Sequence, residues 1–333
     1  MENSLDLDQF PVAAPRIHPL EIFSTKKRVN ISAPMVRYSK LPFRELIRRY
    51  NVDIAYTPMI LSNVFKHSAY SRNFEFQTSL GDDPVIVQFA ASTAVDFADA
   101  AELVAPYCSG VDLNCGCPQK WAIHEHIGSY LMEDPEMIRD MVRQAKARTS
   151  QRQFGGQGGS FPISVKIRVH PDLRKTVDLV RMVEAAGADW ITVHGRTRQM
   201  KNTQPVNLDA IKLMKESVSV PLVANGDVFS LDDANGIFDH CKTDGVMAAR
   251  GLLENPALFS GAATTPWECV EEYVRLGIAY GSTTHIFHHH IMFMLDKLMS
   301  RAEKRYFNTI STIPGIVDYL QDHYGMDIGG IHS

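Results

Sequence analysis

Short apolar runs alternate with amphipathic stretches along most of the chain, from residue 29 to about residue 261. Eight runs are nearly continuous in apolar residues, which is typical of parallel strands that are covered on both faces. They occupy residues 29–36, 54–60, 84–90, 110–116, 163–169, 190–196, 221–227 and 244–250. The stretches between them, such as PEMIRDMVRQAKA and TVDLVRMVEAAG, repeat apolar residues three and four positions apart and therefore predict helices.

Eight strands that alternate with helices predict an α/β fold, the (β/α)8 or TIM barrel. A doubly wound open sheet is the alternative, because the sequence does not show whether the sheet closes. Beyond residue 261 the apolar spacing is helical throughout, which predicts a small C-terminal helical domain. We therefore divide the chain into an N-terminal segment (1–28), a barrel (29–262) and a helical domain (263–333). The glycine-rich residues 151–162 predict a flexible insertion on the stability face of the barrel.

Composition and charge narrow the classes of function. The chain has 333 residues, of which 45% are hydrophobic and 22% are charged, and its formal net charge is -4. This charge argues against nucleic-acid binding by the whole surface but leaves room for a local basic face. The five cysteines form no disulfide framework, the N-terminus lacks a signal-peptide pattern, and no run of about 18 apolar residues predicts a membrane span. We expect a monomer in the cytoplasm, and additionally in the nucleus, without a membrane partner.

Polar and reactive residues stand on or just after the carboxyl ends of most predicted strands, where barrel enzymes place their active sites. The set comprises Ser32, Gln88, Asn114, Cys115, Cys117, Lys166, Arg168, His194, Arg196, Asn225, Asp227 and Arg250. A satisfied polar group at a strand end explains any single member, but it does not explain so many together. We therefore expect the set to line one site.

The residue types in this set favour a planar, electron-poor ligand that becomes anionic. An inward-facing Lys166 needs a counter-charge, because burial of an unpaired ammonium is very unfavourable. The N1/O2 edge of a reduced flavin supplies one. Gln88 can both donate and accept a hydrogen bond, as the N5/O4 edge of a flavin requires.

The loops after the seventh and eighth predicted strands suit a phosphate group. Barrels commonly bind phosphate there, with the help of a short extra helix. His194, the backbone around Gly226 and the turn at Ala249 and Arg250 lie in this region. The extra helix is expected to begin at residues 255–256.

Cys115 and Cys117 flank a glycine at the end of the fourth predicted strand. A zinc site is a poor interpretation, since His124 and His126 follow on a separate segment, and we expect no metal. A disulfide between the two cysteines would close a small strained ring, and a reducing compartment also disfavours disulfides. An inert buried thiol is the simpler interpretation of Cys115. Cys117 lies past the strand end, before Pro118, in a polar loop from which a thiol can act as a general acid.

Seven segments follow one another along the barrel: APMVRYSKLPFR, VQFA, NCGCPQ, VKIR, VHGR, ANGD and MAARGLLENPALF. In this order and spacing they resemble the tRNA-dihydrouridine synthase family, and the resemblance covers about Val29 to Phe259. NCGCP with the following helix and KIR is the specific part, because NGD and ARG also occur in other flavin barrels. The extended NCGCPQKWA and MAARGLLENPALF are most similar to the eukaryotic branch that modifies positions 20a and 20b of the tRNA D-loop.

The resemblance implies an FMN-dependent reduction of the uracil C5–C6 bond driven by NADPH, with hydride transfer to C6 and protonation of C5 by Cys117. The residues that match FMN contacts are Pro34, Met35, Gln88, Lys166, His194, Asn225, Gly226, Asp227, Ala249 and Arg250. Asn114, Arg168 and Arg196 match positions that face the substrate. The chain departs from the family in having HIGSYLM where a YGA-like turn is common, and ARG where GRG is often found.

The C-terminal helices are expected to hold the tRNA body while the uridine is flipped into the barrel. Four basic residues lie three or four positions apart, on one side of a single helix predicted from about residue 285 to 310. They are Lys297, Arg301, Lys304 and Arg305. An ordinary solvated helix face is the alternative interpretation. The histidines at 288–290 are interpreted as helix surface and core.

Two other functions compete with this one. A flavin barrel that acts on a small molecule, such as a dihydroorotate dehydrogenase relative, would need neither the helical domain nor Cys117-Pro118. A catalytically inactive RNA-binding relative would not need Cys117 or Lys166. Flavin absorbance of the purified protein, and flavin turnover by tRNA compared with free uridine, distinguish the three.

Overall fold

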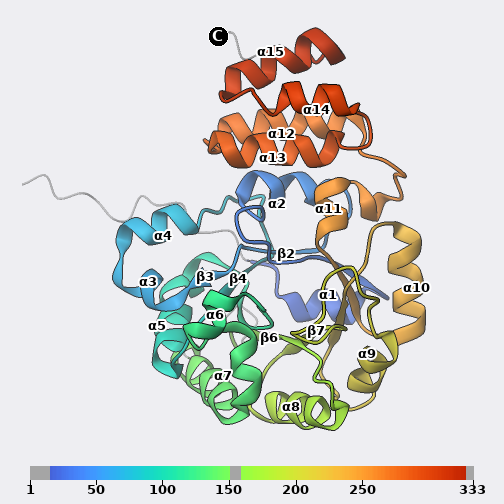
Figure 1. Ribbon diagram of the computed structural model, residues 1–333. Coiled ribbons are helices and arrows are strands. Elements are labelled where there is room, and N and C mark those ends of the chain that lie inside the picture. Colours follow the sequence, from blue (N-terminus) through green and yellow to red (C-terminus); the bar gives the residue numbers. More distant parts are fainter. Residues whose placement is uncertain (1–15, 151–158, 328–333) are drawn as a thin grey trace, which may run out of the picture.

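The computed structural model describes residues 16–150 and 159–327 (Figure 1). Its centre is a closed barrel of eight parallel strands. The strands are β1 (Val29–Ser32), β2 (Ile54–Tyr56), β4 (Val85–Ala90), β5 (Gly110–Cys115), β6 (Ile163–Arg168), β7 (Trp190–His194), β8 (Leu222–Asn225) and β9 (Gly245–Ala248). Pairing of β1 with β9 and of β2 with β4 closes the ring. The predicted (β/α)8 barrel is confirmed, and the open-sheet alternative is wrong.

Each predicted apolar run contains one barrel strand, but the run at 54–60 is not continuous. Strand β2 ends at Tyr56, and a two-residue strand, β3 (Ile60–Leu61), pairs with the carboxyl end of β4. Pro58 lies between them and has no N–H to donate, so the ladder is interrupted there.

Helices surround the barrel in the order of the chain (Figure 1). They are α2 (Leu41–Arg48), α3 (Ser62–His67), α4 (Ala69–Glu75), α5 (Ala94–Val104), α6 (Lys120–His124), α7 (Pro135–Thr149), α8 (Leu173–Ala185), α9 (Leu208–Lys215), α10 (Leu231–Cys241) and α11 (Arg250–Glu254), with a 3-10 helix η3 (Gly128–Glu133). Outward strand residues such as Val111, Leu113 and Cys115 join the core between strands and helices. The residues that alternate with them therefore face the barrel interior.

The amino end of the barrel interior is apolar and closed. Ile31, Tyr56, Trp190 and Met247 belong to the cluster that fills it. Helix α1 (Pro19–Thr25) lies inside the ring of outer helices in Figure 1 and places Phe23 against Trp190, with ring centroids 5.9 Å apart. Ligands can therefore reach the interior only from the carboxyl end.

The C-terminal region forms a helical domain that packs on one side of the barrel (Figure 1). It contains α12 (Trp267–Ala279), α13 (Thr284–Leu295), α14 (Arg301–Phe307) and α15 (Ile313–Tyr324). Helix α12 packs against α2, and the Tyr280 hydroxyl donates to Glu45 Oε1 over 2.7 Å. His290 is fully buried and lies 3.1 Å from the Tyr38 carbonyl oxygen through Nε2. This placement confirms the interpretation of the histidine run as helix surface and core.

The single helix predicted over residues 285–310 is wrong. Helix α13 ends at Leu295, and Ser300 starts α14 with a capping box in which Ser300 and Glu303 exchange hydrogen bonds. Such reciprocal capping satisfies two backbone donors and stabilises a new helix start. Lys297 consequently lies in the turn between two helices rather than beside the other three basic residues.

The short helix expected from residues 255–256 begins earlier, since α11 starts at Arg250 and ends at Glu254. Asn255 instead ends that helix, and its side chain donates to the Ala262 carbonyl oxygen over 2.7 Å. The predicted insertion at 151–162 falls mostly on residues 151–158, which lie outside the described residues. Within residues 16–150 and 159–327, no helix is both long and apolar enough to span a membrane.

Candidate active site

Inward-facing residues at the carboxyl end of the barrel lie in layers set by strand register. Asn114 pairs with Lys166, and Lys166 pairs with Thr192 on the next strand. One step higher, Arg168 pairs with His194, and His194 pairs with Asn225. Residues far apart in the sequence are thus brought together because parallel strands end at the same edge.

Lys166 is half-buried at this end of the barrel interior, which is called the recess from here on. Burial is the main cause that lowers the pKa of its ammonium to about 8, and Arg168 adds to the effect, while Asp112 and Cys117 oppose it. Within the described parts of the chain, no hydrogen bond or ion pair to its ammonium is found. An unpaired cation at this depth favours an anionic ligand, which would supply the missing partner.

His194 is neutral and acts as a hydrogen-bond donor. Burial and the nearby charges of Lys166, Arg168, Arg196 and Arg250 lower the pKa of its imidazole to about 2. Its Nδ1 accepts a hydrogen bond from the Arg196 backbone N–H at 3.2 Å. The hydrogen of the neutral ring therefore resides on Nε2, which is left to donate to a ligand.

A hollow of about 70 Å³ opens beside His194 between the ends of β8 and β9. It is lined by His194, Asn225, Gly226, Asp227, Val228, Phe229, Met247, Ala249, Arg250 and Gly251. Gly226 has a φ of 134°, which a side chain would strain. Backbone, imidazole and guanidinium donors converge here, as binding of a phosphate requires.

Asp227 connects two of the predicted site arginines. Its carboxylate forms an ion pair with Arg196, and its other oxygen lies 3.2 Å from Arg250 Nη2. Arg196 is buried, and its Nε also donates to the Gln204 carbonyl oxygen over 2.5 Å. Arg250 is half-exposed and lies over the Phe229 ring, so its guanidinium remains accessible from the hollow.

The loop of Cys117 is fixed by several contacts. Asn114 Oδ1 accepts from the backbone N–H groups of Gly116 and Cys117, at 3.1 and 2.9 Å. Arg168 Nε donates to the Gly116 carbonyl oxygen over 2.7 Å. A Cβ on Gly128, whose φ is 66°, would lie 2.8 Å from the Cys117 carbonyl oxygen, so only glycine permits this approach.

The two cysteines have different environments. Cys115 is fully buried in the core between strands and helices, and burial raises the pKa of its thiol well above the ordinary value. Cys117 is half-buried, and burial is also the main cause that raises its pKa, against the effects of a backbone hydrogen bond, Arg168 and Lys166. The Cys117 thiol therefore keeps its proton at neutral pH and can deliver it to a ligand.

Asp112 is the site residue that the sequence reasoning missed. It is fully buried and faces inward on β5, where it accepts from Ser164 Oγ at 2.6 Å and from Gln88 Nε2 at 2.8 Å. Burial raises its pKa to about 6, against the opposing effects of these two hydrogen bonds and of Lys166. A lone acidic residue in the apolar run GVDLNCG was the available signal.

The remaining predicted residues lie in two places. Pro34 and Met35 follow β1 at the carboxyl end of the barrel and are half-buried. Lys297, Arg301, Lys304 and Arg305 lie in the helical domain, where Lys304 pairs with Asp296 at 2.6 Å. The structure thus brings the cofactor-site candidates together and leaves the basic residues outside the recess.

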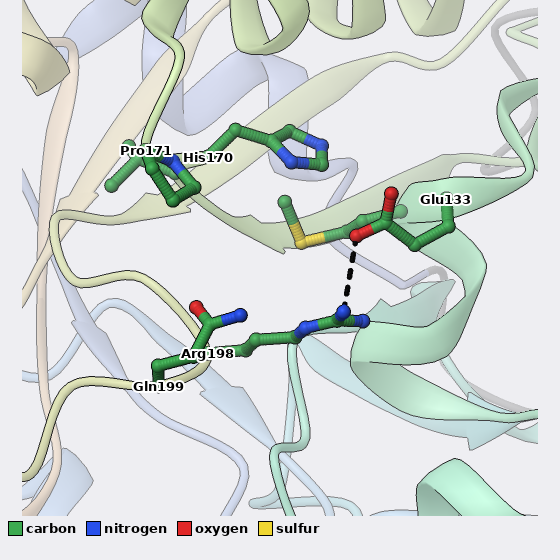
Figure 2. Close-up of a pocket in the computed structure, with 7 residues that line it drawn as sticks. Glu133, His170, Pro171, Arg198 and Gln199 are labelled. Carbon is green, nitrogen blue, oxygen red and sulfur yellow. Dashed lines mark ion pairs between the residues drawn. The ribbon is translucent and has the colours of Figure 1, made fainter.

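A second hollow lies at the rim, between η3 and the loops after β6 and β7 (Figure 2). Arg198 crosses it to Glu133, with 3.3 Å between Nη2 and Oε1, while His170 and Gln199 lie nearby. Its volume of about 20 Å³ has room for about one water molecule. This hollow is therefore too small for a cofactor or a nucleobase.

Comparison with known sequences finds relatives over most of the chain. The family model described as dihydrouridine synthase (Dus) matches residues 31–320. A Mus musculus protein named "tRNA-dihydrouridine(20a/20b) synthase [NAD(P)+]-like" is 49% identical over 92% of this chain and 92% of its own. The human protein of the same name is 48% identical over 92% and 95%. The Schizosaccharomyces pombe "tRNA-dihydrouridine(20a/20b) synthase [NAD(P)+]" is 46% identical over 92% of both chains.

The family match spans both the barrel and most of the helical domain, and it includes the Cys117 loop and the cation-lined recess. On these grounds the chain belongs to the dihydrouridine synthase family.

Proposed function

We propose that this protein reduces a uridine of tRNA to 5,6-dihydrouridine, in the D-loop at positions 20a and 20b, with FMN as cofactor and NADPH as reductant. The names of the relatives support the reaction and the positions. The observation that carries the proposal is that Cys117 follows β5 and Lys166 lies on the neighbouring strand β6, both at the carboxyl end of the barrel, where the Lys166 ammonium has no partner among the described residues.

The recess fits FMN in two respects. The hollow beside His194 offers the imidazole Nε2–H, the Arg250 guanidinium and the backbone at Gly226 to a phosphate. Lys166 offers an unpaired cation to the ring, whereas the Gln88 amide is fully buried and hydrogen-bonded to Asp112 and Asn114. When bound, FMN supplies the two electrons that NADPH delivers.

The residues of the chain then have separate tasks. Cys117 holds a proton for C5 of the uracil and gives it up as the C5–C6 double bond is reduced, which leaves a thiolate that solvent reprotonates. The cations of Lys166 and Arg168 stabilise that thiolate. Because the recess lies inside the barrel, the uridine has to leave the tRNA stack to enter it.

Flavin turnover separates this proposal from a barrel enzyme that acts on a small molecule. The purified protein is expected to be yellow, and NADPH-reduced flavin is expected to be reoxidised anaerobically by tRNA lacking dihydrouridine. Free uridine and the oxidised small-molecule acceptor orotate should leave the flavin reduced. Equal reoxidation by free uridine would contradict a tRNA substrate, and a colourless protein that binds no FMN would favour an inactive RNA-binding relative.

Substitution of Arg250 by alanine is expected to weaken FMN binding about tenfold. A hydrogen bond to a charged group contributes about 1.5–3 kcal/mol, and part of this is offset because Arg250 already pairs with Asp227. Fluorescence titration of the apoprotein with FMN measures the change. Arg143→Ala, which removes an exposed arginine from α7, is the control. Turnover at saturating FMN should stay near wild type, and unchanged affinity would place the phosphate elsewhere.

The basic residues of the helical domain are expected to bind tRNA phosphates. Arg301 and Arg305 are exposed on α14, whereas Lys297 and Lys304 form ion pairs with Glu254 at 3.9 Å and Asp296 at 2.6 Å, which phosphates would have to replace. Reversal of all four charges to glutamate should lower tRNA affinity. It should also reduce the slope of log affinity against log salt by about one for each phosphate that the variant no longer binds.

Electrophoretic or fluorescence titration at several salt concentrations measures both quantities. A matched control reverses four exposed charges on or next to the barrel helices α7 to α10: Arg143, Arg181, Lys212 and Lys242. The control has the same net charge change, so it separates a local contact from the overall field. Equal reductions of affinity in both variants, or none in the first, would move the RNA-binding surface to residues near the recess such as Lys120.

A further inference from the structure

A chain of hydrogen bonds connects a buried carboxylate to the loop of Cys117. Asp112 Oδ2 accepts from Gln88 Nε2 at 2.8 Å, and Gln88 Oε1 accepts from Asn114 Nδ2 at 2.7 Å. Asn114 Oδ1 then accepts from the backbone N–H of Cys117 at 2.9 Å and of Gly116 at 3.1 Å. Five residues on two neighbouring strands and one loop thus form a single linear path.

The groups at the two ends of this path determine which partner donates and which accepts in every hydrogen bond. These groups are the Asp112 carboxylate and the backbone N–H groups of the loop. A backbone N–H can only donate, so Asn114 has to present its oxygen to the loop and its NH2 group to Gln88. Gln88 therefore has to present its oxygen to Asn114 and its NH2 group to residue 112. An ionised Asp112 is an acceptor at both oxygens, and it thereby holds the two amides in this orientation.

Because these side chains are buried, no water molecule can replace the Asp112 carboxylate as the acceptor for the Gln88 amide. The side chains of Gln88, Asp112 and Ser164 lie side by side in the strand register, and all three residues are fully buried. Solvent water consequently has no access to the Gln88 amide if its acceptor is removed. The other oxygen of Asp112 accepts from the Ser164 hydroxyl at 2.6 Å and leads away from the loop.

We propose that Asp112 is a positioning residue for Cys117, which acts through the orientation of the Gln88 and Asn114 amides. The role of Cys117 as a proton donor rests on the proposed function, whereas the hydrogen-bonded connection from Asp112 to the loop does not. Asp112 forms its hydrogen bonds with Gln88 and Ser164 and none with the thiol, so it sets where the thiol is held rather than taking part in the reaction.

Asp112→Leu removes the acceptor and keeps the branched arrangement of four side-chain heavy atoms, although its two methyl groups are larger than the carboxylate oxygens. The side-chain amide of Gln88 can then flip, and the amide of Asn114 can flip with it. The N–H groups of Gly116 and Cys117 thereby lose a fixed acceptor. Asp112→Asn is the conservative rescue, because its Oδ1 can accept from Gln88 while its NH2 group donates to the Ser164 oxygen. Ser164→Ala is the matched control, since it removes the partner of Asp112 that does not lead to the loop.

The test is amide hydrogen exchange of residues 114–120 in the purified full-length protein at about pH 8, where Asp112 is ionised. Exchange in Asp112→Leu is expected to be about tenfold faster than in wild type, as the loss of two modest hydrogen bonds implies. Alkylation of Cys117 by iodoacetamide should accelerate in parallel, and it reports this thiol because the other four cysteines are buried. Asp112→Asn and Ser164→Ala should both stay within about twofold of wild type.

Wild-type exchange and alkylation in folded Asp112→Leu would overturn the proposal, as would equal acceleration in Ser164→Ala. If Asp112→Leu does not fold, Gln88→Met cuts the same path between Asp112 and Asn114, and its loop has to loosen for the proposal to stand. These readouts use neither tRNA nor NADPH. A wild-type protein that fails to reduce tRNA therefore refutes the proposed function, while the loop measurements still decide the role of Asp112.

Discussion

Cys117→Ala is expected to take up FMN and accept electrons from NADPH as wild type does, but to reduce tRNA about 10²–10⁴-fold more slowly. Loss of a general acid typically costs this much, and a proton is needed at C5 only once the flavin is reduced. Stopped-flow absorbance of the flavin separates the two half-reactions. Flavin reduction should match wild type, and only its reoxidation by tRNA should be slow.

Cys115→Ala is the matched control for this prediction. Cys115 is two positions away but lies in the outer core, where a small apolar side chain replaces it with little effect on the recess. Its turnover should stay within a few-fold of wild type. If Cys115→Ala is the inactive variant, or if Cys117→Ala reoxidises its flavin at the wild-type rate, the acid has been assigned to the wrong thiol.

Lys166→Met is expected to slow flavin reduction by NADPH about 10²–10³-fold at saturating FMN. An oriented charge at a site where negative charge develops typically contributes this much, and methionine keeps the length of the side chain without its charge. Lys212→Met, on the exposed face of α9, is the control for loss of a lysine. A wild-type rate in Lys166→Met would mean that the reacting ring does not lie against this side chain.

The lowered pKa of Lys166 adds a dependence on pH. Because burial lowers its pKa to about 8, the ammonium loses its proton as the pH rises through that value, and the attraction for an anion weakens. Affinity of the wild-type protein for reduced FMN should therefore fall between about pH 7 and 9, a range in which the phosphate itself stays doubly charged. Lys166→Arg should remove this fall, since a guanidinium stays protonated throughout.

Local sequence pattern was sufficient for several features of the site. Strict alternation along each strand puts Lys166, His194 and Asn225 on the face opposite their neighbours in the chain, and the structure shows that this face is the inward one. The alternation along β5 also places Cys115 outward in the buried core, whereas Cys117 lies beyond the strand end. These features were predictable because they depend on the period of the strand and on where it stops.

Contacts between distant segments were not predictable in this way. Asp227 was expected beside a cofactor, but which arginines it pairs with depends on how the loops after β7, β8 and β9 meet. The link from Asp112 to Cys117 likewise requires Gln88, which is 24 residues from Asp112 in the chain and comes beside it only through strand register. The break between α13 and α14 is different, because its Ser300–Glu303 capping signal was present in the sequence.

The sequence by itself therefore determined the alternation of strands and helices, the strand ends that carry polar residues and the existence of a helical domain. Hydrophobic periodicity is a local property of the sequence, so it does not depend on how distant segments of the chain pack. Only the tertiary structure decided that β2 meets β4 to close the barrel, that α1 blocks its amino end and that Lys166 has no partner among the described residues. These outcomes depend on burial and on pairing between residues far apart in the chain, which no local pattern encodes.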